Sequence, residues 1–288
     1  MLRNRLFFGT LMTTLFTAVV IADGWFDGSL TTTPVDDKAV QGTAFCIIVA
    51  LLAIPSQIEL SRLASAKGLK MFLPVSIIAS ILFATASYWP QWPQLIDFPL
   101  QTYLILLSAF VLLALVLYQY LKCGTSAMLA NCGANYFSIA YIGLLSGFCV
   151  TIRIEFGLWH LLSFVLVVKS ADIGAYAIGT MFGKHKFSPG ISPGKSWEGM
   201  GGAMAAAALV AIGFALSCGI MSWLPAIVFG LCFAFIGQVG DLVESMMKRD
   251  SEQKDSGHKV PGFGGVLDII DSPLVAAPFA YLFFLCCS

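Results

Sequence analysis

Acidic, basic and glycine residues alternate in the last hydrophilic segment of this 288-residue chain. Carboxylate oxygens suit Mg²⁺, which proteins bind through one or two carboxylates plus substrate phosphates, and cations could neutralise the remaining phosphate charge. Glycines permit the turns and close ligand approach that such a site needs. The segment therefore predicts a divalent-metal and phosphate site rather than a solvated loop whose charges balance by chance. Its residues are Asp241, Glu244, Asp255, Asp268 and Asp271; Lys248, Arg249, Lys254 and Lys259; and Gly257, Gly262, Gly264 and Gly265.

Two further charged features precede that segment. Lys169 and Asp172 lie three positions apart inside an apolar stretch, so on a helix they share one face. A carboxylate at membrane depth is costly and normally faces a partner or a wet interior. From this spacing, a structural ion pair and a functional site are both open interpretations.

The second feature is a basic segment with two Ser-Pro-Gly turns. Ser192 is expected to cap a helix whose first residue is Pro193. The free N–H groups at such a helix start attract anions, and Lys195 adds a full positive charge. Lys184 and Lys186 extend this positive rim. The segment is therefore interpreted as a turn that attracts anions. An ordinary basic loop on the cytoplasmic side of a membrane would account for Lys184 and Lys186, but not for the paired Ser-Pro-Gly turns.

Long apolar stretches must position these charges. Hydrophobic residues make up 58% of the chain and charged residues only 11%, whereas soluble domains carry about 25% charged residues. A helix needs about 20 apolar residues to cross a hydrocarbon core of about 30 Å. We therefore predict an all-α, polytopic membrane protein with about nine transmembrane helices, at 6–22, 39–56, 71–89, 100–121, 134–152, 158–182, 199–218, 223–241 and 272–287.

Composition also limits the other classes of function. The formal net charge is zero, which gives no support for nucleic-acid binding. The eight cysteines fall mostly in apolar stretches and are interpreted as small hydrophobic residues. Charges, glycines and prolines gather at helix ends only in the later stretches. Residues 1–157 are therefore interpreted as N-terminal transmembrane helices and 158–288 as the catalytic region.

The basic residues predict the orientation in the membrane. If the N-terminus is cytoplasmic, thirteen of the sixteen Lys and Arg residues fall in loops on that side, while the opposite loops hold only Lys38 and Arg153. Short cytoplasmic loops carry an excess of Lys and Arg. We therefore expect a cytoplasmic N-terminus and a charged site that faces the cytoplasm from the cell's inner membrane. A homodimer is one assembly that the sequence leaves open.

At these residues the chain resembles the phosphatidate cytidylyltransferase family, also called CDP-diacylglycerol synthases. The resemblance covers roughly residues 165–275 and rests on three separated motifs in order. Phe263 stands where the family's C-terminal signature has His, and Ile269 where it has Arg. The matching residues are Ala171, Asp172, Ala175 and Tyr176; residues 182–186; Ser192 to Lys195; Gly240 and Asp241; and Ser245, Lys248, Arg249, Lys254, Asp255, Gly257, Pro261, Gly264, Gly265, Asp268 and Asp271.

The resemblance implies an enzyme that transfers the cytidylyl group of CTP to phosphatidate, with Mg²⁺, one ion or two, as cofactor. It makes Asp241 and Asp268 the leading metal ligands, with Asp271 and Asp172 next. The expected phosphate-binding cations are Lys195, Lys248, Arg249 and Lys254. Further substrate contacts are expected from Asp172, Tyr176, Ser192, Ser245, Asp255, Gly264 and Gly265.

Two other functions are compatible with the residues alone. A secondary transporter also places charges and Gly or Pro breaks inside a helical bundle, although related breaks would be expected in both halves. A lipid kinase that uses CTP would need similar groups to bind the same nucleotide. Following the phosphorus atoms of CTP would separate these functions.

Overall fold

The structure, a computed structural model, describes residues 2–30, 38–92, 99–253 and 264–287, and every regular element in these ranges is helical. α5, the π-helical turn η3 and α6 follow one another without a break. The elements are α1 (Leu2–Asp27), α2 (Thr43–Ala66), α3 (Leu73–Ala84), the 3₁₀ helix η2 (Trp89–Gln91), α4 (Leu100–Cys123), α5 (Met128–Ile139), η3 (Ala140–Leu144), α6 (Leu145–Glu155), α7 (Leu158–Phe182), α8 (Trp197–Cys218), α9 (Trp223–Asp250) and α10 (Leu267–Cys287).

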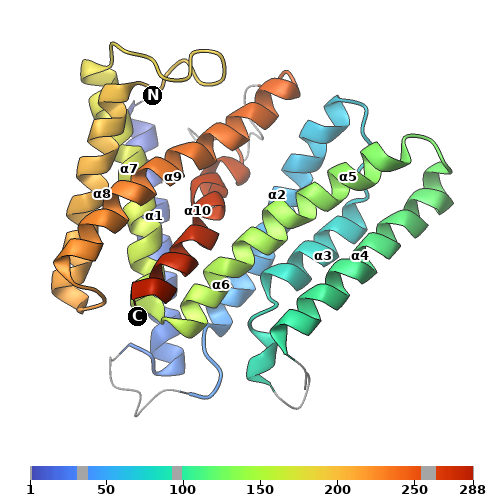
Figure 1. Cartoon of the computed structure of the whole chain (residues 1–288), viewed down its shortest axis with the longest axis horizontal. Helices are drawn as coiled ribbons and strands as arrows, with labels where there is room; N and C mark the ends of the chain where they lie inside the picture. Colours follow the sequence, from blue (N-terminus) through green and yellow to red (C-terminus); the bar gives the residue numbers. More distant parts are fainter. Residues whose placement is uncertain (1, 31–37, 93–98, 254–263, 288) are drawn as a thin grey trace.

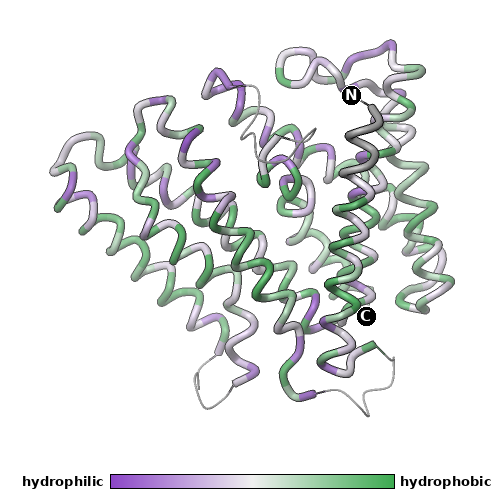
Figure 2. The backbone as a smooth tube through the Cα atoms, turned by 180° about the vertical axis from the view of Figure 1, so that it is seen from behind, coloured by the Kyte–Doolittle hydropathy of each residue, from purple (hydrophilic) through white to green (hydrophobic). Residues whose placement is uncertain are grey.

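The helices run alternately in opposite directions through one bundle (Figure 1). α1 and α7 to α9 occupy one side, α3 to α5 the other, and α2, α6 and α10 lie between them. α2, α4, α7 and α9 end at the same end of the bundle as the start of α1. Hydrophobic residues follow the middle of the helices, and hydrophilic residues gather toward their ends (Figure 2). The loops that the sequence assigns to one side of the membrane therefore share one end of the bundle.

The prediction of an all-α, polytopic membrane protein is confirmed, but the stretch 71–89 is not one full transmembrane helix. Among the described residues, eight helices are long and apolar enough to cross a membrane, and α3 is the shorter ninth. With 12 residues, α3 is only about 18 Å long at 1.5 Å per residue. The Thr85 hydroxyl bonds back to the Ile81 carbonyl (2.8 Å), and the chain then turns into η2.

Several helices extend beyond the apolar stretches that predict them, and three of these extensions carry charged residues of interest. α2 continues to Ala66 instead of 56, α9 continues to Asp250 instead of 241, and α10 begins at Leu267 instead of 272. An apolar stretch marks the part of a helix that meets lipid, whereas the helix itself continues where charged side chains find partners. As a result, Asp241, Glu244, Lys248 and Arg249 lie on helical turns of α9, and Asp268 and Asp271 lie on α10.

A fully buried arginine joins α1 and α2 to α6 at the opposite end from the basic loops. Arg153 of α6 donates from Nε to Asp23 (2.9 Å) and from a terminal nitrogen to Asp27 (2.7 Å). The same two carboxylates accept hydrogen bonds from the Ala44 N–H (2.8 Å) and the Gly42 N–H (2.9 Å) at the start of α2. Each carboxylate therefore balances the arginine and fixes the N-terminus of α2.

The proposed division of the chain at residue 157 stays a prediction. α7 packs on α8, α8 on α9 and α9 on α10, which groups the later helices. However, α1 also packs against α7, and α10 packs against α6 and α2. The first helices therefore form part of the support for the later ones.

The crossing of α7 and α8 depends on small residues. A Cβ atom at Gly174 would lie 2.4 Å from the Gly202 carbonyl oxygen and 2.8 Å from the Ala206 Cβ. In a lipid environment, helices associate through close packing of this kind, because lipid removes most of the hydrophobic driving force. The α7–α8 contact is therefore sensitive to a single added methyl group.

We expect Gly174→Ala to lower the unfolding temperature of the purified protein in detergent, because overpacking typically costs about 1–3 kcal/mol. Gly213→Ala is the matched control, since a Cβ atom at Gly213 on α8 would meet no neighbouring described residue within 4 Å. The control should be neutral or gain up to about 1 kcal/mol from higher helix propensity. Equal unfolding temperatures for the two variants would contradict the tight crossing.

Candidate functional site

α9 and α10 approach each other closely beside two carboxylates. A Cβ atom at Gly240 would lie 2.8 Å from the Cα of Ser272. The neighbouring residues, Asp241 on α9 and Asp271 on α10, are therefore brought together although they are distant in the sequence. Glycine at 240 is needed for this approach, because any side chain there would press on the backbone of α10.

Asp241, Glu244 and Asp271 form a carboxylate group at this crossing. One oxygen of each lies within 4.8 Å of the others. Glu244 and Asp271 are 1% and 3% exposed. Asp271 accepts a hydrogen bond from the Ser272 N–H (2.6 Å), but it forms no ion pair with any other described residue.

The carboxylate group fits a divalent cation. Glu244 Oε1 is buried and has no hydrogen-bond partner among the described residues. Burying several carboxylates together is strongly unfavourable unless positive charge balances them. Three convergent oxygen ligands of this type are those that Mg²⁺ accepts, with water or phosphate completing its shell.

Lys248 lies beside the carboxylate group. Its Nζ donates to Glu244 Oε2 and to Asp268 Oδ1, both at 2.6 Å. The other oxygen of Asp268 accepts a hydrogen bond from the Gly265 N–H (2.6 Å). Asp268 is therefore paired with a lysine and lies outside the carboxylate group. Its role as a metal ligand stays a prediction.

Lys195, in the loop before α8, connects three parts of the site. Its Nζ donates to the Gln238 carbonyl and pairs with Asp241 Oδ2, both at 2.8 Å. The side-chain amide of Gln238 in turn donates from Nε2 to the Asp172 carboxylate on α7 (3.2 Å), and Lys169 pairs with the same carboxylate at 3.4 Å. The ion pair expected from the spacing of Lys169 and Asp172 is present, and it is linked to the carboxylate group.

The prediction that Ser192 caps a helix starting at Pro193 is wrong. The Ser192 carbonyl accepts a hydrogen bond from the Lys195 N–H (3.1 Å), which closes a turn with proline at its second position. α8 begins later, and Ser196 is its N-cap, with its hydroxyl accepting from the Gly199 N–H (3.2 Å). Lys195 is therefore positioned by a turn and not by the helix start that the sequence predicts.

The basic loop between α7 and α8 is held at its start and near its middle. Arg249 of α9 donates from Nε to the Ile191 carbonyl (3.2 Å). The Glu198 carboxylate accepts hydrogen bonds from the N–H groups of Lys184 and His185, both at 3.2 Å. These contacts hold the loop, and Lys195 with it, against α9.

The other predicted site residues show no direct contact with the carboxylate group or lie outside the described residues. Tyr176 lies one turn beyond Asp172 with its side chain 43% exposed, and Ser245 follows Glu244 on α9. Gly264 has φ of 98°, a left-handed value that favours glycine, and leads the chain into α10. Lys254, Asp255 and the departing residue Phe263 lie outside the described residues.

Sequence reasoning missed one carboxylate and gave another no specific role. Glu244 is among the residues of the predicted metal segment but not among the named ligands, although its spacing from Asp241 already places both on one helix face. Glu59 of α2 is fully buried and accepts a hydrogen bond from the Leu267 N–H (2.9 Å) at the start of α10. The only sign of Glu59 in the sequence is that it is a single acidic residue just after the apolar stretch 39–56. The first half of the chain therefore takes part in positioning the site.

Comparisons with known proteins agree with the motif pattern. The model of the cytidylyltransferase family matches residues 38–287. Three relatives named phosphatidate cytidylyltransferase are similar to this chain. The Bacillus subtilis protein is 35% identical over 178 residues, which cover 61% of this chain and 66% of the relative. The Haemophilus influenzae protein is 43% identical over 134 residues, covering 44% and 46%. The Staphylococcus aureus (strain COL) protein is 31% identical over 238 residues, covering 81% and 86%. The chain thus spans less than two-thirds of the first two relatives and most of the third.

We expect Mg²⁺ to raise the unfolding temperature of the purified protein, because a ligand that binds the folded state at 100 times its Kd stabilises it by about 2.7 kcal/mol. Glu244→Gln should lose most of this rise. Glu252→Gln is the matched control, since the Glu252 side chain is 89% exposed at the end of α9. A wild-type response of Glu244→Gln to Mg²⁺ would exclude Glu244 as a ligand.

Proposed function

We propose that this chain, which belongs to the cytidylyltransferase family, transfers the cytidylyl group of CTP to phosphatidate and so produces CDP-diacylglycerol and pyrophosphate. The observation that carries the proposal is the carboxylate group, flanked by Lys195 and Lys248. It lies between two helices that are long and apolar enough to cross a membrane. A charged site in such a position suits a reaction between a lipid phosphate and a soluble nucleotide.

In the proposed reaction, an oxygen of the phosphatidate phosphate attacks the α-phosphorus of CTP. A new P–O bond forms, and the bond between the α-phosphorus and the oxygen bridging to the β-phosphate breaks to release pyrophosphate. Transfers of this kind depend chiefly on positioning and on neutralising phosphate charge. Mg²⁺, one ion or two, would supply that charge at the attacking and leaving oxygens. The residues that would hold it are Asp241, Glu244 and Asp271.

The lysines of the site bind and orient the phosphates. Lys195 and Lys248 are each bonded to carboxylates, at 2.8 and 2.6 Å. Once the carboxylate charge is shared with a bound cation, both ammonium groups can turn to phosphate oxygens, for which an ammonium is a compact point-charge donor. We infer that the two lysines alternate between carboxylate and phosphate partners as substrates arrive and leave.

We also propose that the site faces the cytoplasm from the cell's inner membrane. Lys195 lies in the loop after α7, at the same end of the bundle as the start of α1 (Figure 1). That end carries the loops rich in Lys and Arg, which favour the cytoplasmic side. CTP and pyrophosphate would then exchange with the cytosol, while the lipid stays in the bilayer.

The path of phosphorus from CTP tests the reaction. With CTP labelled at the α-phosphate, phosphatidate and Mg²⁺, we expect the label to enter the lipid, because the cytidine and its α-phosphate are transferred together. With CTP labelled at the γ-phosphate, the lipid should stay unlabelled and the label should leave as pyrophosphate. A lipid kinase gives the reverse result for both labels, and a transporter gives no labelled lipid. Label in the lipid from the γ-position would overturn the proposal.

Cysteine labelling tests the orientation. In a variant without the eight native cysteines, His185→Cys should be protected from a membrane-impermeant thiol reagent in intact cells. The His185 side chain is 79% exposed, so burial in the protein would not explain that protection. Lys38→Cys, at an exposed position in the loop before α2, is the matched control and should react from outside. The opposite pattern would reverse the proposed sidedness.

A further inference from the structure

The rod formed by α5, η3 and α6 changes its geometry at Tyr141. Residues Ala140–Leu144 adopt a π-helical turn, and Ser146 donates its hydroxyl to the Ile142 carbonyl (2.5 Å) just beyond it. A Cβ atom at Gly143 would lie 2.7 Å from the Cα of Ser80 on α3, so the rod is pressed against α3 at this turn. π-Helical turns are rare, and they often re-aim a side chain at a functional site.

Tyr141 points into the space between the two halves of the chain. It is 5% exposed and packs in a buried cluster with Leu60 of α2 and Leu267 and Leu274 of α10. Val243, which precedes Glu244, packs against the same cluster. The Tyr141 ring also stacks on Phe137, with centroids 5.9 Å apart and planes at 18°. These contacts fix the ring, and with it the direction of the hydroxyl.

The hydroxyl of this fixed ring has no hydrogen-bond partner among the described residues. Leu267, Asp271 and Leu274 lie on one face of α10, and because Tyr141 packs in the cluster that contains Leu267 and Leu274, its ring lies on the side of the carboxylate group. A buried hydroxyl without a partner is unfavourable, and nearly all such groups in proteins are bonded to protein or water. We therefore expect a ligand or water bound beside the three carboxylates to supply the hydrogen-bond acceptor for the Tyr141 hydroxyl.

We propose that Tyr141 is a residue of the substrate site and that its hydroxyl donates a hydrogen bond to an oxygen held at the carboxylate group. That oxygen belongs to a phosphate of the substrates or to a water on the cation; both are acceptors of the same kind. This inference rests on the proposed function for the identity of the occupant. It adds to the site a residue from the first half of the chain, outside the motifs of the second half.

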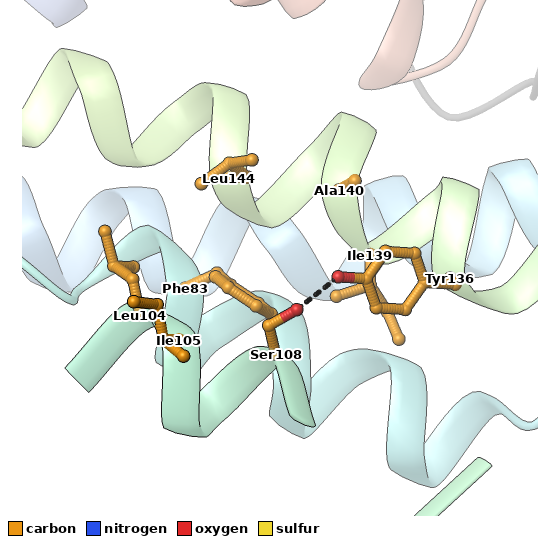
Figure 3. Close-up of a pocket in the computed structure, with 8 residues that line it drawn as sticks. All are labelled: Phe83, Leu104, Ile105, Ser108, Tyr136, Ile139, Ala140 and Leu144. Atoms are coloured by element: carbon orange, nitrogen blue, oxygen red, sulfur yellow. Dashed lines mark hydrogen bonds between the residues drawn. The ribbon is translucent and has the colours of Figure 1, made fainter. Parts of the chain in front are cut away.

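Tyr141→Phe tests the proposal, with Tyr136→Phe as the matched control. Tyr136 lies in the same rod, and its hydroxyl shares a hydrogen bond with Ser108 of α4 (2.5 Å). It lines an apolar groove with Phe83, Leu104 and Ile139 between α3, α4 and α5 (Figure 3). Each variant removes one hydroxyl and leaves the ring, so the two differ only in the partner that is lost.

Without metal and nucleotide, Tyr141→Phe should unfold at the same temperature as the wild type or higher, because it removes a hydroxyl that has no partner. Its kcat/KM for CDP-diacylglycerol synthesis should fall roughly 10- to 100-fold, as for the loss of one hydrogen bond to a charged acceptor. Tyr136→Phe should unfold at a lower temperature and keep its activity within about threefold. A raised KM for Mg²⁺ would identify a water on the cation as the acceptor, and a raised KM for CTP or phosphatidate would identify a phosphate.

Wild-type turnover by Tyr141→Phe would overturn the inference. Lost turnover would also overturn it if Tyr141→Phe unfolds at a lower temperature than Tyr136→Phe, because the hydroxyl would then have a structural role. If the wild type makes no CDP-diacylglycerol, the proposed function fails and a second measurement decides the inference alone. Mg²⁺ with inorganic pyrophosphate should raise the unfolding temperature of the wild type more than that of Tyr141→Phe. An equal rise in unfolding temperature for the wild type and Tyr141→Phe would overturn the inference about Tyr141.

Discussion

The close crossing of α9 and α10 at Gly240 and Ser272 is the constraint on which the charged site depends. Small residues allow two helices in a membrane to pack backbone to backbone, and here that contact also sets the separation of Asp241 and Asp271. The crossing therefore brings carboxylates together in the buried interior of a membrane bundle, where charge is unfavourable. The surrounding helices and loops supply the groups that make this arrangement tolerable.

Those supporting groups come from separate parts of the chain. Lys195 reaches Asp241 from a loop, Lys248 reaches Glu244 from the next turn of α9, and Glu59 holds the start of α10 from the first half. In a low-dielectric interior each charge acts strongly on the next one. The charged groups of these separate elements are therefore electrostatically linked around the carboxylate group.

The sequence predicts the helices well because lipid imposes a simple length and polarity requirement on each of them. It also predicts that Lys169 pairs with Asp172, since three positions along a helix fix that geometry. It fails where the outcome depends on contacts between distant segments. Two turns compete to begin α8, and only the packed loop selects Ser196 over Ser192. Likewise, the spacing of Asp241 and Glu244 does not show that Asp271 lies beside them, because that depends on how α10 crosses α9.

The buried arginine at the other end of the bundle has a consequence for biogenesis. Asp23 and Asp27 of α1 are balanced by Arg153, which lies 126 positions after Asp27 in the sequence. At a synthesis rate of about 5–20 residues per second, roughly 6 to 25 s pass before the arginine follows the second aspartate from the ribosome. During that interval the two carboxylates of the first helix have the N–H groups at the start of α2 as partners, but not the arginine. The charge balance of α1 is therefore completed only when α6 has been made, after about half of the chain.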